Sequence, residues 1–159
     1  MASSKETGQI VYILRRDTHT VFPETPIDEV IRVIDQNDIQ RVAVVDADGK
    51  LLGLISDRDL LRYFKQEEEG LWSLLARVKH PLKPNACRSD LQQCLTETSA
   101  GAVMTTELIT VREEMLIEEA IVLMTEKALK RLPVVDEAGR FKGLISRDSL
   151  LRTGFGGPA

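Results

Sequence analysis

Residues 53–62 read GLISDRDLLR, and residues 143–152 read GLISRDSLLR. Each copy is an apolar run of strand length, closed by a serine and followed by polar residues and a Leu-Leu pair. This order predicts a buried strand whose carboxyl end turns directly into a helix. The amino terminus of a helix carries unpaired N–H groups that favour an anion, so the repeated corner is a candidate binding site.

The similarity extends beyond this stretch at a constant offset of 90 residues. Between residues 20–62 and 110–152, 18 of the 43 aligned positions are identical. Because a solenoid needs about three or more repeats, two copies favour a pair related by pseudo-twofold symmetry.

Within each copy the pattern predicts a strand, a helix, two strands and a second helix. In the first copy, Thr25 is the expected N-cap of the first helix and Pro26 its first residue. That helix should end near Asn37. Residues 41–45 and 51–55 then form a hairpin around a turn at 46–49.

Composition restricts the classes of function. The chain of 159 residues is 43% hydrophobic and 29% charged, which is typical of a globular protein. A net charge of −4 and an aromatic content of 4% argue against a nucleic-acid partner. Cys87 and Cys94 form no CxxC motif, and no metal spacing, signal peptide or membrane span is recognised. We expect a cytoplasmic protein without membrane insertion.

The repeated residues resemble the CBS (cystathionine-β-synthase-type) domain, present as a tandem pair. The resemblance rests on five segments and on their matches in the first copy: Val103-Met104-Thr105, Ile109-Thr110-Val111, residues 120–123, residues 131–136 with Gly139, and residues 143–146. It implies an α+β fold of two βαββα repeats that pack sheet to sheet with pseudo-twofold symmetry. We place the first repeat at 11–64, a helical insertion at 65–98 and the second repeat at 99–153, and expect residues 1–10 and 154–159 to be flexible.

The family resemblance also implies a regulatory role. Many members bind AMP, ADP, ATP or S-adenosylmethionine, associate as dimers and report to a fused or partner protein; no cofactor is required. In the first copy, Ser56 and Asp59 match the Ser/Thr-x-x-Asp motif, in which the aspartate accepts hydrogen bonds from ribose hydroxyls and the hydroxyl residue faces phosphate. Arg58 or Arg41 can then contact phosphate. By the same resemblance, Thr20 contacts the base and Ala43 lies where apolar residues clamp adenine.

The second copy departs from the motif, because Ser149 stands in the place of the aspartate and Asp148 comes one position early. One residue along a helix rotates a side chain by about 100°. We therefore predict two unequal sites. The weaker one takes the equivalent residues Thr110, Arg131, Pro133, Ser146, Asp148 and Ser149.

Each of these residues also has a structural interpretation. Ser-x-x-Asp is a capping box, Thr20 and Thr110 favour strands, Ala43 and Pro133 suit a core, and Arg41 and Arg131 suit surface ion pairs. The alternative function is a ligand-free dimerisation module, for which Trp72 in the insertion is a candidate contact. An enzyme is not expected, because no nucleophile motif, P-loop or metal cluster is recognised.

Overall fold

The structure is a computed structural model that describes residues 8–16, 18–37, 39–63, 65, 93 and 95–155. The chain forms two compact units. One, the first-repeat unit, comprises His19–Asp46 and Leu52–Thr106; the other, the second-repeat unit, comprises Met1–Thr18, Ala47–Leu51 and Glu107–Ala159. Most of the predicted insertion at 65–98, including Trp72, lies outside the described residues.

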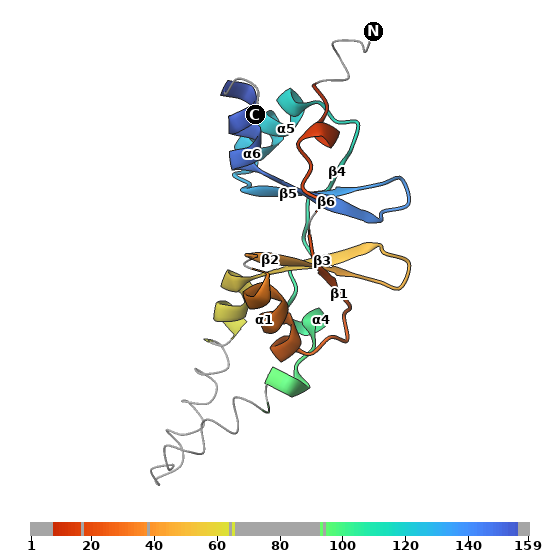
Figure 1. The fold of residues 1–159 in the computed structure, drawn as a ribbon, viewed down its shortest axis with the longest axis vertical. Helices are drawn as coiled ribbons and strands as arrows, with labels where there is room; N and C mark the ends of the chain where they lie inside the picture. Colours follow the sequence, from red (N-terminus) through yellow and green to blue (C-terminus); the bar gives the residue numbers. More distant parts are fainter. Residues whose placement is uncertain are drawn as a thin grey trace. The chain divides into compact units, whose positions relative to one another are not determined.

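The first-repeat unit has the predicted βαββα order. Its three-stranded sheet has the order β1-β2-β3, with β1 parallel to β2. Helix α1 covers one face of this sheet (Figure 1). The elements are β1 (Thr20–Val21), α1 (Ile27–Gln36), β2 (Arg41–Val45), β3 (Leu51–Ser56) and a helix over residues 57–63.

The second-repeat unit has the same order of elements. In its sheet β4-β5-β6, β4 is parallel and β6 antiparallel to β5. The elements are β4 (Val111–Arg112), α5 (Ile117–Glu126), β5 (Arg131–Val135), β6 (Phe141–Ser146) and α6 (Arg147–Phe155). The predicted α+β class and its two repeats are confirmed. Helix α6 extends through Phe155, into the range that the sequence assigned to a flexible end.

Both hairpins turn at a glycine in the left-handed region, Gly49 at φ 82° and Gly139 at φ 81°. In the second hairpin, Asp136 Oδ1 accepts hydrogen bonds from the N–H groups of Ala138 and Arg140, both at 2.9 Å. The Arg140 bond is the main reason that the pKa of Asp136 lies below its ordinary value. These contacts explain why an aspartate precedes this turn.

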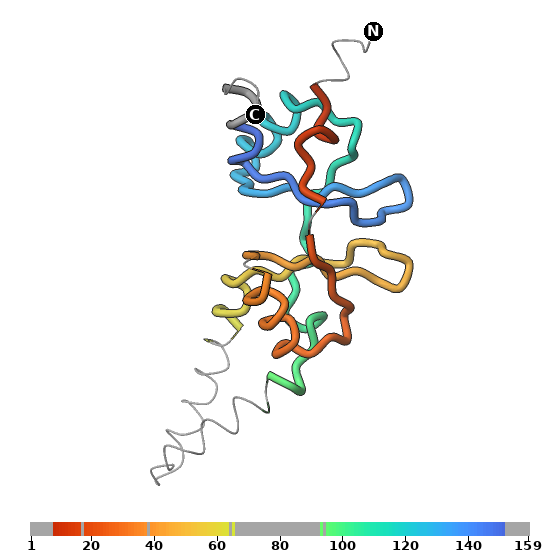
Figure 2. Tube along the Cα trace, in the orientation of Figure 1, coloured from red at the N-terminus to blue at the C-terminus, as the bar shows by residue number. Residues whose placement is uncertain are grey.

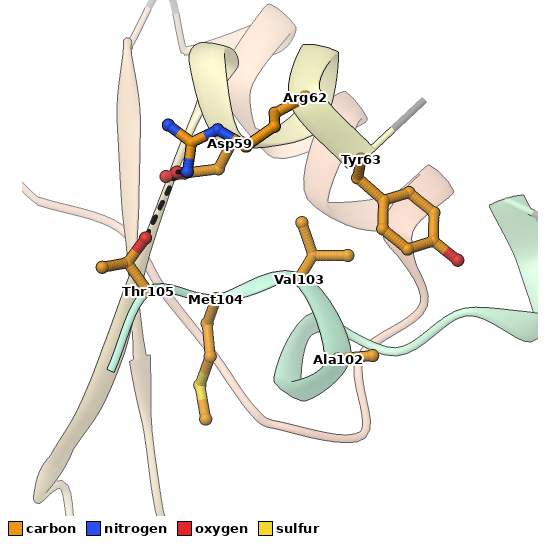
Figure 3. A pocket seen from close by; sticks show the side chains of 7 residues that line it. All are labelled: Asp59, Arg62, Tyr63, Ala102, Val103, Met104 and Thr105. Atoms are coloured by element: carbon orange, nitrogen blue, oxygen red, sulfur yellow. Dashed lines mark hydrogen bonds and ion pairs between the residues drawn. The ribbon is translucent and has the colours of Figure 1, made fainter. Parts of the chain in front are cut away.

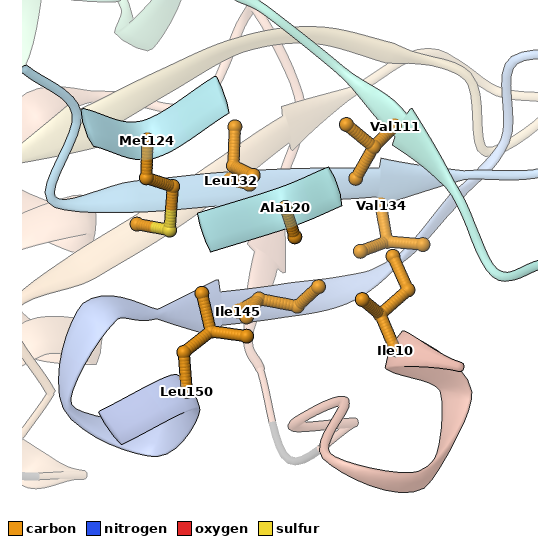
Figure 4. Packing of buried hydrophobic residues seen from close by; sticks show 8 residues of the cluster. All are labelled: Ile10, Val111, Ala120, Met124, Leu132, Val134, Ile145 and Leu150. Carbon is orange, nitrogen blue, oxygen red and sulfur yellow. The ribbon is translucent and has the colours of Figure 1, made fainter. Parts of the chain in front are cut away.

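A hydrophobic core fills each unit between the sheet and its helices. In the second-repeat unit, strand residues such as Leu132 and Ile145 face Ala120 and Met124 of α5 (Figure 4). Ile10 completes this core with no exposed surface, although it belongs to the beginning of the chain. Burying a side chain of this size stabilises the fold by about 1.5–3 kcal/mol.

Ile10 lies on the first of two equivalent segments, which we name the lead segments: Gly8–Arg15, with the 3₁₀ turn η1 (Ile10–Tyr12), and Thr98–Thr105, with α4 (Ala100–Val103). Each precedes one repeat in sequence but packs in the unit of the other repeat. Figure 2 shows the first lead segment beside the elements of the second-repeat unit.

The two lead segments make the same backbone bonds. In one unit, Ile10 N–H donates to Met115 (2.9 Å) and Ile117 N–H donates to Gly8 (2.7 Å). In the other, Ala100 N–H donates to Thr25 (2.7 Å) and Ile27 N–H donates to Thr98 (3.0 Å). The second lead segment therefore supplies a hydrogen-bond partner for the amino terminus of α1.

This arrangement corrects the predicted start of α1. The helix begins at Ile27, and Pro26 is its extended N-cap (φ −63°, ψ 148°) without a side-chain cap bond. Thr25, the predicted N-cap, instead accepts a hydrogen bond from Phe22 N–H at its hydroxyl (3.0 Å). The prediction was wrong because the partner of the first helical N–H is a carbonyl more than 70 residues away in sequence.

Each lead segment crosses its sheet at the glycine that opens the repeated stretch. A Cβ on Gly53 would lie 2.7 Å from Met104 Sδ and 2.9 Å from Met104 Cβ. A Cβ on Gly143 would overlap the carbonyl oxygen of Arg15 and lie 2.9 Å from Leu14 Cδ1. Gly143 also has φ +152°, a conformation that favours glycine. The repeated glycine is therefore required by a close approach of the lead segment, through the Met104 side chain at Gly53 and the Arg15 backbone at Gly143.

We expect Gly143→Ala to lower the free energy of unfolding by at least about 2 kcal/mol, because it adds a clash with backbone to a strained φ. Gly139→Ala is the matched control: its φ is also positive, but nothing lies within 4 Å of the added Cβ. This control should cost only about 1–2 kcal/mol. Urea unfolding of both variants measures the difference, and equal losses would contradict a role for the crossing.

Candidate functional site

The corner between β3 and the helix over 57–63 is held by reciprocal hydrogen bonds between Ser56 and Asp59. The Asp59 N–H donates to Ser56 Oγ at 3.2 Å, while Asp59 Oδ2 accepts from Ser56 N–H at 2.9 Å and from Ser56 Oγ at 2.7 Å. Ser56 is buried, with 6% of its surface exposed. The capping box considered from the sequence is therefore formed.

The second carboxylate oxygen of Asp59, Oδ1, takes no part in the cap. Asp59 Oδ1 accepts a hydrogen bond from Thr105 Oγ1 at 3.2 Å, and Arg62 Nη1 lies 3.9 Å from it. At 3.9 Å, Arg62 and Asp59 form an ion pair but no hydrogen bond. A carboxylate has about four lone-pair sites, and these contacts use three of them. Asp59 can therefore hold the helix and still accept a further donor.

A pocket of about 190 Å³ lies beside Asp59. Asp59, Arg62 and Tyr63 line it from one face of the helix, since residues three and four positions apart share a face. The second lead segment forms the opposite wall with Ala102, Val103, Met104 and Thr105 (Figure 3). One end of the pocket is thus charged and hydroxylated, and the other is apolar and aromatic.

The size of this pocket limits what it can enclose. Pockets that bury most of a drug-sized ligand have about 300–1,000 Å³. At about 190 Å³ this pocket is smaller than that range, with room for a group the size of a sugar but not for a whole nucleotide.

The equivalent corner in the second-repeat unit has no carboxylate in its cap. The hydroxyls of Ser146 and Ser149 lie 2.8 Å apart, and Ser149 N–H donates to Ser146 Oγ at 3.2 Å. Asp148 is exposed, one position before Ser149. The position that matches Thr105 is Arg15. The two corners therefore differ in charge as well as in residue type.

Three other predicted residues of the first motif lie on the same sheet, and Arg58 lies on the helix that follows it. Thr20 is exposed on β1 and pairs with the buried Ala43 on β2. Arg41 opens β2 and is partly buried, whereas Arg58 is exposed. None of the four lines the pocket beside Asp59.

In the second motif, Arg131 lies opposite Ser146 in the ladder between β5 and β6, and Pro133 lies opposite Leu144. Pro133 is buried, and Thr110 is exposed directly before β4. The ladder thus brings Arg131 and Ser146 together. The binding roles of all these residues stay predictions.

Of the seven residues that line the pocket, only Asp59 was among the predicted site residues. Arg62 and Tyr63 follow Asp59 at helical spacings of three and four, which could have marked them. Thr105 gave no such signal, because only the crossing of the lead segment brings it to Asp59. Tyr63 is held by a hydrogen bond of 3.1 Å between its hydroxyl and that of Thr98.

Two further features are absent from the described residues. No group of three or more His, Cys, Asp or Glu side chains there could hold a metal ion. Among the helices of the same residues, none combines the length and apolar character needed to cross a membrane.

Known proteins match both repeats. The family model of the CBS domain matches residues 9–66 and 100–156. An uncharacterised protein of Methanocaldococcus jannaschii is 31% identical over 154 residues, with 91% of each chain covered. The chloroplast protein CBSX1 of Arabidopsis thaliana is 34% identical over 144 residues; this match covers 87% of the present chain but only 59% of CBSX1.

The fold also matches a crystal structure of CBSX2 in complex with AMP. The sequence identity is 25% and the TM-score 0.67, with 92% of this chain and 95% of the other covered.

The two corners give a prediction about stability. We expect Ser56→Ala to cost about 1–2 kcal/mol, since it removes a cap and a hydrogen bond to a carboxylate. Ser146→Ala should cost less, about 0.5–1 kcal/mol, because Ser146 Oγ contacts a neutral hydroxyl and an N–H. Urea unfolding compares the two, and a larger loss for Ser146→Ala would contradict the assignment of the charged cap to Asp59.

Proposed function

Because the chain belongs to the CBS domain family, we propose that it is a non-catalytic regulatory module that binds an adenosine nucleotide in the pocket beside Asp59. The observation that carries this proposal is the state of the Asp59 carboxylate. Its Oδ2 is fixed by Ser56, its Oδ1 keeps one acceptor site to spare, and Asp59 lines the pocket. The AMP complex of CBSX2 supports the choice of ligand class.

The chemistry of the pocket suits the sugar of a nucleotide. A carboxylate only accepts hydrogen bonds, so it is complementary to ribose hydroxyls. The first hydroxyl can use the remaining site on Asp59 Oδ1, and a second can replace Thr105 Oγ1. Val103 and Met104 offer apolar surface to the base.

Regulation requires that the ligand bind two arrangements of the protein with different affinity. Thr105 contacts the site directly and lies in the chain just before the second repeat. A ligand that replaces the Thr105 hydroxyl at Asp59 therefore acts on the connection between the repeats. The protein that reads this change, fused or separate, is the effector that the family resemblance implies.

We expect AMP to bind the purified protein in isothermal titration calorimetry and Asp59→Ala to weaken this binding at least about tenfold, the loss expected for a hydrogen bond to a charged group. The matched control is Asp57→Ala. Asp57 is an exposed carboxylate of the same helix turn, but it does not line the pocket. The proposal fails if AMP, ADP, ATP and S-adenosylmethionine all give no heat with the wild type.

The alternative is a module that dimerises without a ligand. Two leucines at equivalent positions support it: Leu61 is 69% exposed and Leu151 is 45% exposed, each on the helix that follows its Ser-x-x motif. Exposed apolar side chains on equivalent helices suit a contact between two copies of the chain. A dimer is compatible with both functions.

We expect sedimentation velocity to show a dimer that Leu61→Ser combined with Leu151→Ser converts largely to monomer. Phe22→Ser is the control, since Phe22 is 54% exposed but follows β1 rather than lying on either helix. A wild type that stays monomeric at high concentration would exclude this contact.

A further inference from the structure

The pocket beside Asp59 contains a positive charge that the recognised motif does not require. Arg62 lines the pocket one helical turn after Asp59, and Figure 3 shows its guanidinium group next to the Asp59 carboxylate. Its side chain is 62% exposed, and the closest distance to Asp59 is 3.9 Å. The arginine thus stands at the pocket without a short hydrogen bond to Asp59.

A comparison within the same unit shows that this contact is loose. Arg32 on α1 pairs with Asp28 at 3.0 Å and forms a hydrogen bond with it. Arg62 keeps its five N–H donors at a distance from Asp59 that is too long for such a bond. Its guanidinium can therefore turn toward a ligand with little loss of existing contacts.

The charges at the pocket explain why this matters. The Asp59 carboxylate attracts the hydroxyl groups of a sugar but repels an anion that lies next to the sugar. Arg62 offsets this repulsion, and an arginine can bind a phosphate through two parallel N–H bonds. The pair therefore accepts a sugar and an attached phosphate together.

We infer that Arg62 determines ligand class at this site by selecting phosphate-bearing adenosine nucleotides over ligands without phosphate, such as adenosine and S-adenosylmethionine. This inference rests on the proposed function and makes it more specific. It also differs from the sequence prediction, which assigned phosphate contacts to Arg41 or Arg58; neither lines this pocket.

Calorimetric titration of AMP and adenosine into the wild type, Arg62→Gln and Arg62→Lys tests the inference. In the wild type, AMP should bind at least about tenfold more tightly than adenosine, the difference expected for one charge-assisted contact. Arg62→Gln should remove most of this preference by weakening AMP alone. Arg62→Lys should keep part of it, because a lysine retains the charge but not the paired donors.

Arg32→Gln is the matched control, because Arg32 is an exposed, ion-paired helix arginine of the same unit that does not line the pocket. It should leave both affinities unchanged. If Arg62→Gln weakens AMP and adenosine equally, or neither, the inference is wrong while the proposed function stands. If the wild-type protein binds none of AMP, ADP, ATP, adenosine and S-adenosylmethionine, both are overturned.

Discussion

The fold depends on the passage of each lead segment across a sheet at a glycine. Gly53 and Gly143 leave no room for a Cβ because Met104 and the backbone of Arg15 occupy that space. The crossing brings in Ile10 for one core and Ala100 for the other. Since each unit contains a segment that precedes the other repeat, neither repeat can complete its core from its own residues alone.

The two lead segments also bring different residues to the two corners. The lead segment places Thr105 within hydrogen-bond distance of Asp59 in one unit and brings Arg15 to the sheet in the other. Asp59 caps the helix through Oδ2 and accepts the Thr105 hydroxyl through Oδ1, so the cap and the contact with the lead segment use different oxygens of one carboxylate. The serine pair at Ser146 and Ser149 keeps the cap and lacks this second acceptor.

The repeat made most of the fold predictable. Once the offset of 90 was recognised, the hairpins and helices of one copy supported those of the other, and the strands at 41–45 and 51–56 lie where periodicity placed them to within a residue. Contacts between distant segments were not predictable. The start of α1 was misplaced because the N–H of its first residue donates to Thr98, far away in sequence. Thr105 was missed because nothing in the sequence around it indicates that it lies next to Asp59.

The hydrogen bond between Thr105 and Asp59 also sets how a ligand can act. It occupies one of the two acceptor sites on Oδ1, so under the proposed function one sugar hydroxyl would fill the free site and a second would replace this internal contact. Because the Thr105 hydrogen bond is lost when the second sugar hydroxyl binds, that hydroxyl contributes less binding free energy. Its contribution also depends on the position of the lead segment. If the ligand binds one position of the lead segment twofold or threefold more tightly than another, the free-energy difference is less than about 1 kcal/mol. A tenfold difference in affinity needs about 1.4 kcal/mol. A single charge-assisted hydrogen bond at Asp59 is of that size, and this is the difference that the proposed regulation requires from the Thr105 contact.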